Sequence, residues 1–477
     1  MIRTLFALSL FAGSAIPAFA GQAPFAAMAA NIPVGHKDRF YSSDQFSNTV
    51  SVIDPSTNQL LGVIRLGDPT PMNLSPLYKG QLLVHGMGFS PDHRTLASIS
   101  VGSNSVTFID TTTNAVKHTS YVGRSPHEAF WTPDGSEVWV AVRGENYLQV
   151  LDGNSYEAKT RITVPNGPGM TIFAPDGHYA YVCSSFTPET VVIDTRTKEI
   201  VGHVKQVSPF CPDIAATPDG QQVWMTLKDT GKTMVFNAKP PFNVLKVLDT
   251  GPITNHVNIV RNGAGQFAYI TIGAENLVKV VRTDTFAQIA AIPVGALPHG
   301  IWPSGDGSRV YVGLENADAV AAIDTLSNKV IATIPIGQAP QGVAYVPDAV
   351  STGDGKTGLE PLGVAAKSYQ FKLSGSGSDT PTQVTLFDQG QVQVLQAAAV
   401  GLKPKAPYVL ALARDPSGKG ELQPIASFTT NPAGAAIVNT VAPLRNVVSA
   451  NTPEPRRYLV ITEGKPDSLG AIVQRQQ

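Results

Sequence analysis

Charged residues are scarce in this chain, and the basic ones do not gather in runs. Asp, Glu, Lys and Arg together make up 15% of the 477 residues, and the formal net charge is −1. Dedicated nucleic-acid-binding proteins usually carry a concentrated basic patch. The composition therefore disfavours a nucleic-acid partner, because single-stranded nucleic acid would need a basic and aromatic groove on one face.

Several motifs that define enzyme classes are also absent. The chain has no C-x-x-C-H motif for covalent haem, no G-x-S-x-G nucleophile turn and no G-x-x-x-x-G-K-[ST] phosphate loop. These absences disfavour serine-hydrolase and nucleoside-triphosphatase functions. After the first twenty residues no run approaches the roughly 18 apolar residues of a membrane span, so we expect no transmembrane segment in the mature chain.

The first twenty residues have the pattern of a secretory signal peptide. Arg3 precedes an apolar run, and Ala18-Phe19-Ala20 matches an A-x-A cleavage site. We expect a signal peptide over residues 1–20 and an N-terminal leader over residues 21–37. The mature protein is then periplasmic or extracellular.

The main feature of the chain is a repeat of about 42 residues made of short strands and turns. The segments HGMGFSPDHRTLASIS, HEAFWTPDGSEVWVAV and GMTIFAPDGHYAYVCS begin at residues 85, 127 and 169, and related segments begin at 212, 256, 299 and 341. Each unit reads as an apolar inner strand, a Pro-Asp-Gly type turn and three further short strands. That is the pattern of one β-propeller blade.

Counting the units predicts a ring of seven blades over residues 38–348. Residues 38–66 supply only the last three strands of a blade, and the strand at 339–347 supplies the missing inner strand. Both ends of the domain therefore meet in one blade and close the ring, which leaves only short, protected sheet edges.

The strand motifs VWVAV, YAYVC, FAYIT and RVYVG, with VVID-like strands and IPVG or IPIG endings, resemble the YVTN family of β-propeller repeats. The resemblance covers about two thirds of the chain and implies a seven-bladed propeller. It does not imply one function, because such propellers include binding and scaffold proteins, lactonase-like enzymes and carriers of redox cofactors.

An aspartate follows a short apolar strand in five of the seven units, at Asp54, Asp110, Asp152, Asp194 and Asp324. A carboxylate in a turn can accept hydrogen bonds from backbone N–H groups two residues further on. We therefore expect these aspartates to close hairpins and to have no catalytic role.

A second domain is expected after a Gly-, Ser- and Thr-rich linker over residues 349–365. Residues 366–477 contain about seven alternating strands, which favours a small β-sandwich. The segment GLKPKAPYVLALA resembles a fibronectin-III-like loop and strand with a buried Tyr408. We expect an accessory or stabilising role for this domain and a frayed tail over residues 467–477. The predicted fold class is all-β, a seven-bladed β-propeller followed by a small β-sandwich domain.

Four of the nine histidines fall at or beside one level of the repeat, where the inner strands begin at one mouth of the channel. These are His85, His127, His256 and His299. Converging neutral imidazoles would suit zinc or copper, and Met170 or Cys211, one step from the ring, would favour copper. The alternative is that the histidines only line a wet channel and were inherited by repeat duplication.

Three further groups accompany this ring. Gln341 occupies the same level, and Glu128 is either a general base beside His127 or a solvated surface carboxylate. Cys183 ends the second strand of one blade and Cys211 begins the inner strand of the next, so in an oxidising compartment they are candidates for a disulfide. If they are bridged, Cys211 cannot bind metal. The long insertion over residues 69–83 is a candidate lid.

The sequence favours an exported, monomeric binding protein that uses the channel mouth for a partner protein, a polymer or a small ligand, with Gln341, Glu128 and Met170 as candidate ligand contacts. The competing hypothesis is a copper- or zinc-dependent enzyme or redox protein that uses the histidine ring for lactonase-like hydrolysis, lyase chemistry or copper chemistry.

Overall fold

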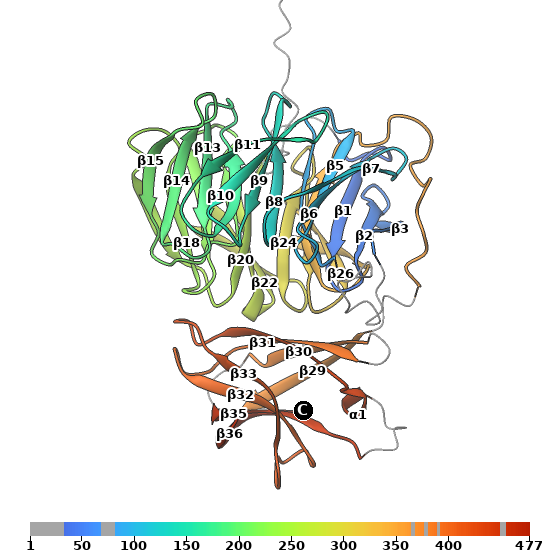
Figure 1. Cartoon of the computed structure of the whole chain (residues 1–477), viewed down its shortest axis with the longest axis vertical. Coiled ribbons are helices and arrows are strands. Elements are labelled where there is room, and N and C mark those ends of the chain that lie inside the picture. Colours follow the sequence, from blue (N-terminus) through green and yellow to red (C-terminus); the bar gives the residue numbers. More distant parts are fainter. Residues whose placement is uncertain (1–32, 68–81, 364–367, 376–379, 389–391, 449–454) are drawn as a thin grey trace, which may run out of the picture.

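The computed structural model describes residues 33–67, 82–363, 368–375, 380–388, 392–448 and 455–477. The predicted signal peptide and most of the candidate lid lie outside these ranges. Within them the chain is almost entirely β-structure, with seven four-stranded sheets arranged as a propeller and one eight-stranded sheet below it (Figure 1). The predicted fold class is confirmed.

Each blade pairs its strands in simple antiparallel order from the channel outward. The blades are, in order, β28 (Pro340–Val346), β1 (Arg39–Asp44), β2 (Thr49–Asp54) and β3 (Gln59–Arg65); β4 (Val84–Phe89), β5 (Thr95–Ser100), β6 (Ser105–Asp110) and β7 (Val116–Tyr121); β8 (Pro126–Trp131), β9 (Glu137–Val142), β10 (Tyr147–Asp152) and β11 (Ala158–Thr163); β12 (Pro168–Phe173), β13 (Tyr179–Ser184), β14 (Glu189–Asp194) and β15 (Ile200–Lys205); β16 (Ile214–Ala216), β17 (Gln222–Leu227), β18 (Lys232–Asn237) and β19 (Val244–Asp249); β20 (Thr254–Asn262), β21 (Gly265–Ile272), β22 (Leu277–Arg282) and β23 (Gln288–Pro293); and β24 (Pro298–Pro303), β25 (Arg309–Leu314), β26 (Ala319–Asp324) and β27 (Lys329–Pro335). A 3₁₀ turn, η3, covers Gly273–Glu275.

The ring closes as the repeat count predicts. Strand β28, near the end of the propeller, pairs with β1 at its start, and Phe40 lies opposite Tyr345 in the register. Blade 1 is therefore made from both ends of the domain.

Buried aromatic residues at the middle of the second strands join neighbouring blades. Tyr41, Tyr181, Tyr269 and Tyr311 are buried, and each hydroxyl reaches a backbone carbonyl of the following blade. The Tyr181 hydroxyl, for example, donates to the carbonyl of Ala238 at 2.5 Å. Each such side chain buries a ring between sheets while satisfying its polar tip.

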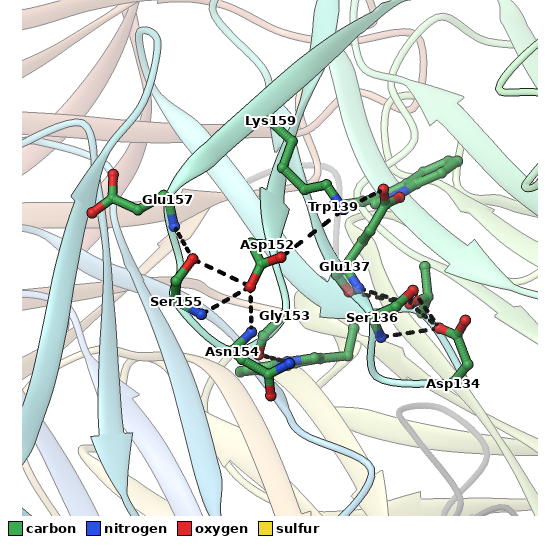
Figure 2. A network of polar contacts seen from close by, with 12 residues as sticks. Asp134, Ser136, Glu137, Trp139, Asp152, Gly153, Asn154, Ser155, Glu157 and Lys159 are labelled. Atoms are coloured by element: carbon green, nitrogen blue, oxygen red, sulfur yellow. Dashed lines mark hydrogen bonds and ion pairs between the residues drawn. The ribbon is translucent and has the colours of Figure 1, made fainter.

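The turn aspartates close hairpins, as expected. Figure 2 shows Asp152 accepting hydrogen bonds from the backbone N–H groups of Asn154 and Ser155, at 3.0 and 2.9 Å. In the preceding turn of the same blade, Asp134 accepts from the N–H of Ser136 at 3.0 Å. Asp54, Asp110, Asp194 and Asp324 make equivalent contacts.

The C-terminal domain is one continuous sheet of eight strands that nearly closes on itself as a barrel-like sandwich. Its strands are β29 (Ser368–Gly375), β30 (Thr382–Asp388), β31 (Gln393–Ala399), β32 (Pro407–Ala413), β33 (Gln423–Thr429), β34 (Ala436–Ala442), β35 (Tyr458–Lys465) and β36 (Ser468–Gln476), with a short helix α1 (Arg445–Val448). The end strands β33 and β34 meet where the Thr440 hydroxyl donates to the carbonyl of Ile425. Tyr408 is buried, and its hydroxyl accepts a hydrogen bond from the N–H of Lys403.

The expectation of a frayed C-terminal tail is wrong. Residues 468–476 form β36, which pairs with β35 and, at its end, with β29. Within this tail Gln474 is buried, and its side chain donates to the carbonyl of Val400. The apolar positions of the tail therefore complete the sheet.

The linker segment runs along the outside of blades 1 and 2. Glu360 forms a β-bridge with Val63 of β3, and Asn114 donates to the carbonyls of Gly355 and Thr357. This path carries the chain from the end of β28 to the C-terminal domain at the other side of the propeller (Figure 1).

The C-terminal domain packs across the propeller mouth where the inner strands begin. Ile253 and Leu297, which precede inner strands, form an apolar cluster with Ala398 and Val400 of the C-terminal domain. The Thr385 hydroxyl donates to the carbonyl of Asn316 across the same interface.

Within the described ranges, no helix has both the length and the apolar character needed to cross a bilayer.

Candidate functional site

The four predicted ring histidines lie together at the covered mouth of the channel. His85 and His127 have ring centroids 4.6 Å apart, as do His256 and His299, and His85 lies 6.3 Å from His299. Glycines near them let the inner strands approach, because a Cβ at Gly86 would collide with the carbonyl oxygen of His127. The structure therefore brings together all four side chains in one layer.

Burial keeps these imidazoles neutral. It lowers the pKa of His85 and His256 to about 3, with the charge of Lys228 adding to the effect, and it lowers the pKa of His127 and His299 well below the usual value. Several ring nitrogens have no hydrogen-bond partner: Nδ1 of His85, His127 and His299, and Nε2 of His256.

Two buried carboxyl groups lie deeper in the channel. Glu128, Asp213, Met170 and His256 line a cavity of about 20 Å³, which has room for one water molecule. Burial raises the pKa of Asp213 to about 8 and that of Glu128 well above its usual value, and the neighbouring Asp213 raises the pKa of Glu128 further. The interpretation of Glu128 as a solvated surface carboxylate is wrong, since only 3% of it is exposed.

A larger chamber of about 590 Å³ separates the histidine layer from the C-terminal domain. His85, His127, His299 and Gln341 line it from the inner strands, whereas Met170 does not. Its other propeller residues include Gln45, Arg143, Phe210, Lys228, Asp229 and Glu315, and its C-terminal residues include Gln396, Thr429, Asn431 and Asn439.

Two cations of the chamber wall have no ion-pair partner. Within the described residues, no carboxylate oxygen lies within 4.0 Å of the charged nitrogens of Arg143 or Lys228, although Glu315 and Asp229 act on Lys228 from further away. Phe210 stands near both, with its ring centroid 5.0 Å from Arg143 and 6.0 Å from Lys228. Burial lowers the pKa of Arg143 to about 10 and also lowers that of Lys228.

The opposite wall carries a buried carboxyl group that the C-terminal domain contacts. Gln396 of β31 donates from Nε2 to Oε1 of Glu315 at 2.6 Å. Glu315 also lies 4.0 Å from Nδ1 of His299, and burial raises its pKa. This contact joins the C-terminal domain, which forms the cap of the chamber, directly to the propeller mouth.

A disulfide lies directly behind the cationic wall. Cys183 at the end of β13 is bonded to Cys211, and their Cα atoms are 6.0 Å apart. Cys211 stands between Phe210 and Pro212, both of which line the chamber. The bond therefore fixes the segment that carries Phe210 and leaves no thiolate at Cys211 for a metal.

Comparison with known proteins identifies the family. The family model described as YNCE-like beta-propeller matches residues 5–350. The chain belongs to this family.

Individual relatives of this YNCE-like protein are distant. It is similar to Protein NirF of Stutzerimonas stutzeri, 25% identical over 118 residues, which cover 24% of this chain and 30% of NirF. It is also similar to the uncharacterized protein YncE of Salmonella typhi, 21% identical over 207 residues, which cover 37% of this chain and 58% of YncE. The matches thus span well under two thirds of either relative.

A solved structure with the same architecture is a functionally unknown protein from Desulfotomaculum acetoxidans. It has a TM-score of 0.55 at 14% identity, covering 64% of this chain and 98% of that one. This likeness shows the fold alone.

Three charged residues of the chamber, Arg143, Lys228 and Glu315, belong to a second ring that sequence reasoning missed in this YNCE-like propeller. This ring is the position directly after the second strand of each blade: Gln45, Val101, Arg143, Ser185, Lys228, Gly273 and Glu315. Aligning the repeats at this position, as was done for the histidines, would have shown two cations and a carboxylate at one level. Within the described residues, no group of three or more His, Cys, Asp or Glu side chains is arranged to hold a metal ion.

Proposed function

We propose that this protein is a binding protein that holds a small anionic ligand in the chamber between the propeller mouth and the C-terminal domain. The observation that carries the proposal is the pair of partly buried cations, Arg143 and Lys228, which line the chamber and have no ion-pair partner among the described residues. A charge removed from water is costly unless it is paired. A carboxylate or phosphate in the chamber would supply that partner.

The chamber also has the size and lining of a small-molecule site. Its volume of about 590 Å³ falls in the usual range of roughly 300–1,000 Å³ for ligand pockets. The neutral imidazoles add hydrogen-bonding groups without adding positive charge, and Phe210 adds an aromatic face.

A metal-dependent enzyme is the second candidate, and the neutral four-histidine layer is the observation that favours it. Neutral imidazole is the form that binds zinc or copper. Elemental mass spectrometry of protein purified without chelator tests this candidate. One equivalent of metal in the wild type, lost in the His127→Ala/His299→Ala variant, would support it.

Export from the cytoplasm is part of the proposal. The buried disulfide between Cys183 and Cys211 suits an oxidising compartment, and the first twenty residues read as a signal peptide. Cell fractionation with an antibody to the protein tests this expectation.

A thermal-shift screen with small carboxylates and phosphates tests the binding function. We expect at least one anion to raise the melting temperature of the wild type and to have little effect on the Arg143→Met/Lys228→Met variant. The matched control is Arg196→Met/Lys246→Met, which removes the same charge from two exposed sites outside the chamber. Equal responses in all three proteins would refute the proposal.

A further inference from the structure

We propose that the ligand of the chamber is a sugar acid, a hydroxylated carboxylate of which D-glucuronate is a simple probe. This inference rests on the proposed function and deepens it. It starts from the unequal distribution of polar groups around the chamber wall.

The chamber has a cationic side and a hydroxyl-binding side. Arg143 and Lys228 extend from blades 3 and 5, whereas Glu315 belongs to blade 7 and Gln341 to blade 1. A ligand that contacts both sides needs an anionic group at one end and neutral hydrogen-bonding groups at the other. A simple inorganic anion would leave the second side unused.

Behind the surface of the second side lie buried polar atoms that have no hydrogen-bond partner. Oε1 of Gln396 has no hydrogen-bond partner, although its Nε2 binds Glu315, and Nδ1 of His85 and His299 are also unpartnered. Gln396 and His299 are at least nine-tenths buried, so bulk water does not compensate these atoms freely. A hydroxyl group both donates and accepts, so it can pair with an amide oxygen and with an imidazole nitrogen in either tautomer.

The remaining lining fits a sugar ring. Phe210 offers an aromatic surface close to both cations, against which the C–H face of a sugar can pack. From the C-terminal domain, Asn439 adds a carboxamide that can contact further hydroxyl groups, whereas Oδ1 of Asn431 already accepts from the backbone N–H groups of Ala433 and Ala435. The cap thus contributes part of the specificity for hydroxylated ligands.

Calorimetric titration of the full-length protein tests this assignment with three probes. D-Glucuronate carries both a carboxylate and hydroxyl groups, hexanoate carries the carboxylate alone, and D-glucose carries the hydroxyl groups alone. We expect one site per chain for glucuronate, with affinity at least about tenfold higher than for either other probe, because each of them leaves buried polar groups unpaired. Glucose 6-phosphate, as a fourth probe, distinguishes a sugar phosphate from a sugar acid.

Variants of the cap separate the sugar proposal from the anion proposal. Gln396→Leu should weaken glucuronate binding by about tenfold more than it weakens hexanoate binding. Asn439→Leu, at an exposed cap position, should act in the same direction without disturbing the core. The control is Gln370→Leu, an exposed glutamine of the same domain outside the chamber.

Two results would overturn the inference in distinguishable ways. If hexanoate binds as tightly as glucuronate, or if glucose 6-phosphate binds and glucuronate does not, the sugar-acid assignment fails while the anion-binding function stands. If no anion binds in a manner that depends on Arg143 and Lys228, both proposals fail.

Discussion

At the scale of single residues, the repeat aspartates show how a local rule sets a side chain's role. Acceptor and donor are only two or three residues apart, so the contact depends on the turn alone. Asp134 accepts from the N–H and the hydroxyl of Ser136, at 3.0 and 2.8 Å, and from the hydroxyl of Thr132 at 2.6 Å. Such contacts can be predicted from sequence because they need no information about the rest of the fold.

Removing one of these acceptors should destabilise its hairpin. We expect Asp134→Ala to lower the free energy of unfolding by about 1 kcal/mol, because the turn N–H and two hydroxyls lose their common acceptor. Asp134→Asn keeps an oxygen at the same place and should retain most of the stability. Urea unfolding of the two variants and the wild type measures the difference, and equal losses would contradict the role.

The chamber residues could not be assigned in the same way. Arg143 and Lys228 are separated by a whole blade in sequence, and Gln396 reaches Glu315 from another domain. Repeat alignment could have placed the first two in one ring, but only the fold shows that a cap covers them. The significance of the two cations comes from their place in that covered chamber.

At the scale of elements, the disulfide links neighbouring blades where an inner strand is short. Strand β16 has three residues, and the segment before it carries Phe210 and Cys211. The bond from Cys211 to Cys183 encloses 28 residues of sequence separation. It therefore replaces some of the strand pairing that other blades have at this level.

Removing the disulfide should destabilise the propeller and loosen the Phe210 segment. We expect the Cys183→Ala/Cys211→Ala variant to lose about 3 kcal/mol of unfolding free energy, since the open chain gains conformational entropy when unfolded. Urea titration of the oxidised wild type and the variant provides the measurement. A variant as stable as the wild type would show that packing alone holds the segment.

The strands of the second domain show which elements the alternation of apolar and polar residues predicts and which it does not. The alternation of apolar and polar residues predicts seven of its eight strands. It does not predict β36, because terminal segments often fray. Strand β36 is ordered because its neighbours β35 and β29 both offer it free edges. This pairing joins segments that are far apart in the sequence, so it cannot be predicted from the residues of the tail alone.

At the scale of the whole molecule, the repeat fixed the number of blades, their strand order and the closure by β28. Each follows from a period near 42 residues and from two partial units at the ends. The placement of the C-terminal domain over the histidine mouth does not follow, because it depends on side-chain packing between two domains. The site therefore required the structure, whereas the propeller fold did not.

The buried titratable groups should give stability a distinct pH dependence. Burial raises the pKa of Asp44 and Asp213 to about 8, so the folded state holds protons that the unfolded state has already lost, and stability falls as pH rises from about 4 to 8. Burial lowers the pKa of His85 and His256 to about 3, so these histidines make stability rise as pH rises from about 3 to 6.5. Above about pH 6.5 they are neutral in both states and no longer change the stability. We expect the melting temperature to fall between about pH 6.5 and 8.

An Asp44→Asn variant tests the carboxyl part of this behaviour. Oδ2 of Asp44 accepts hydrogen bonds from the hydroxyls of Thr49 and Ser51, and an amide oxygen can accept the same bonds. The variant should show a flatter decline above pH 6.5 than the wild type or an exposed-site control, Asp176→Asn. Calorimetric melting across this range measures it, and three parallel curves would rule out the raised pKa of Asp44 as a cause.

The most direct test of the binding function is calorimetric titration of the anion that stabilises the wild type most in the screen. We predict one site per chain in the wild type and in Arg196→Met/Lys246→Met, and at least about tenfold weaker binding in Arg143→Met/Lys228→Met, because each charged hydrogen bond contributes roughly 1.5–3 kcal/mol. The same affinity in all three proteins would place the ligand elsewhere and contradict the assignment of the chamber.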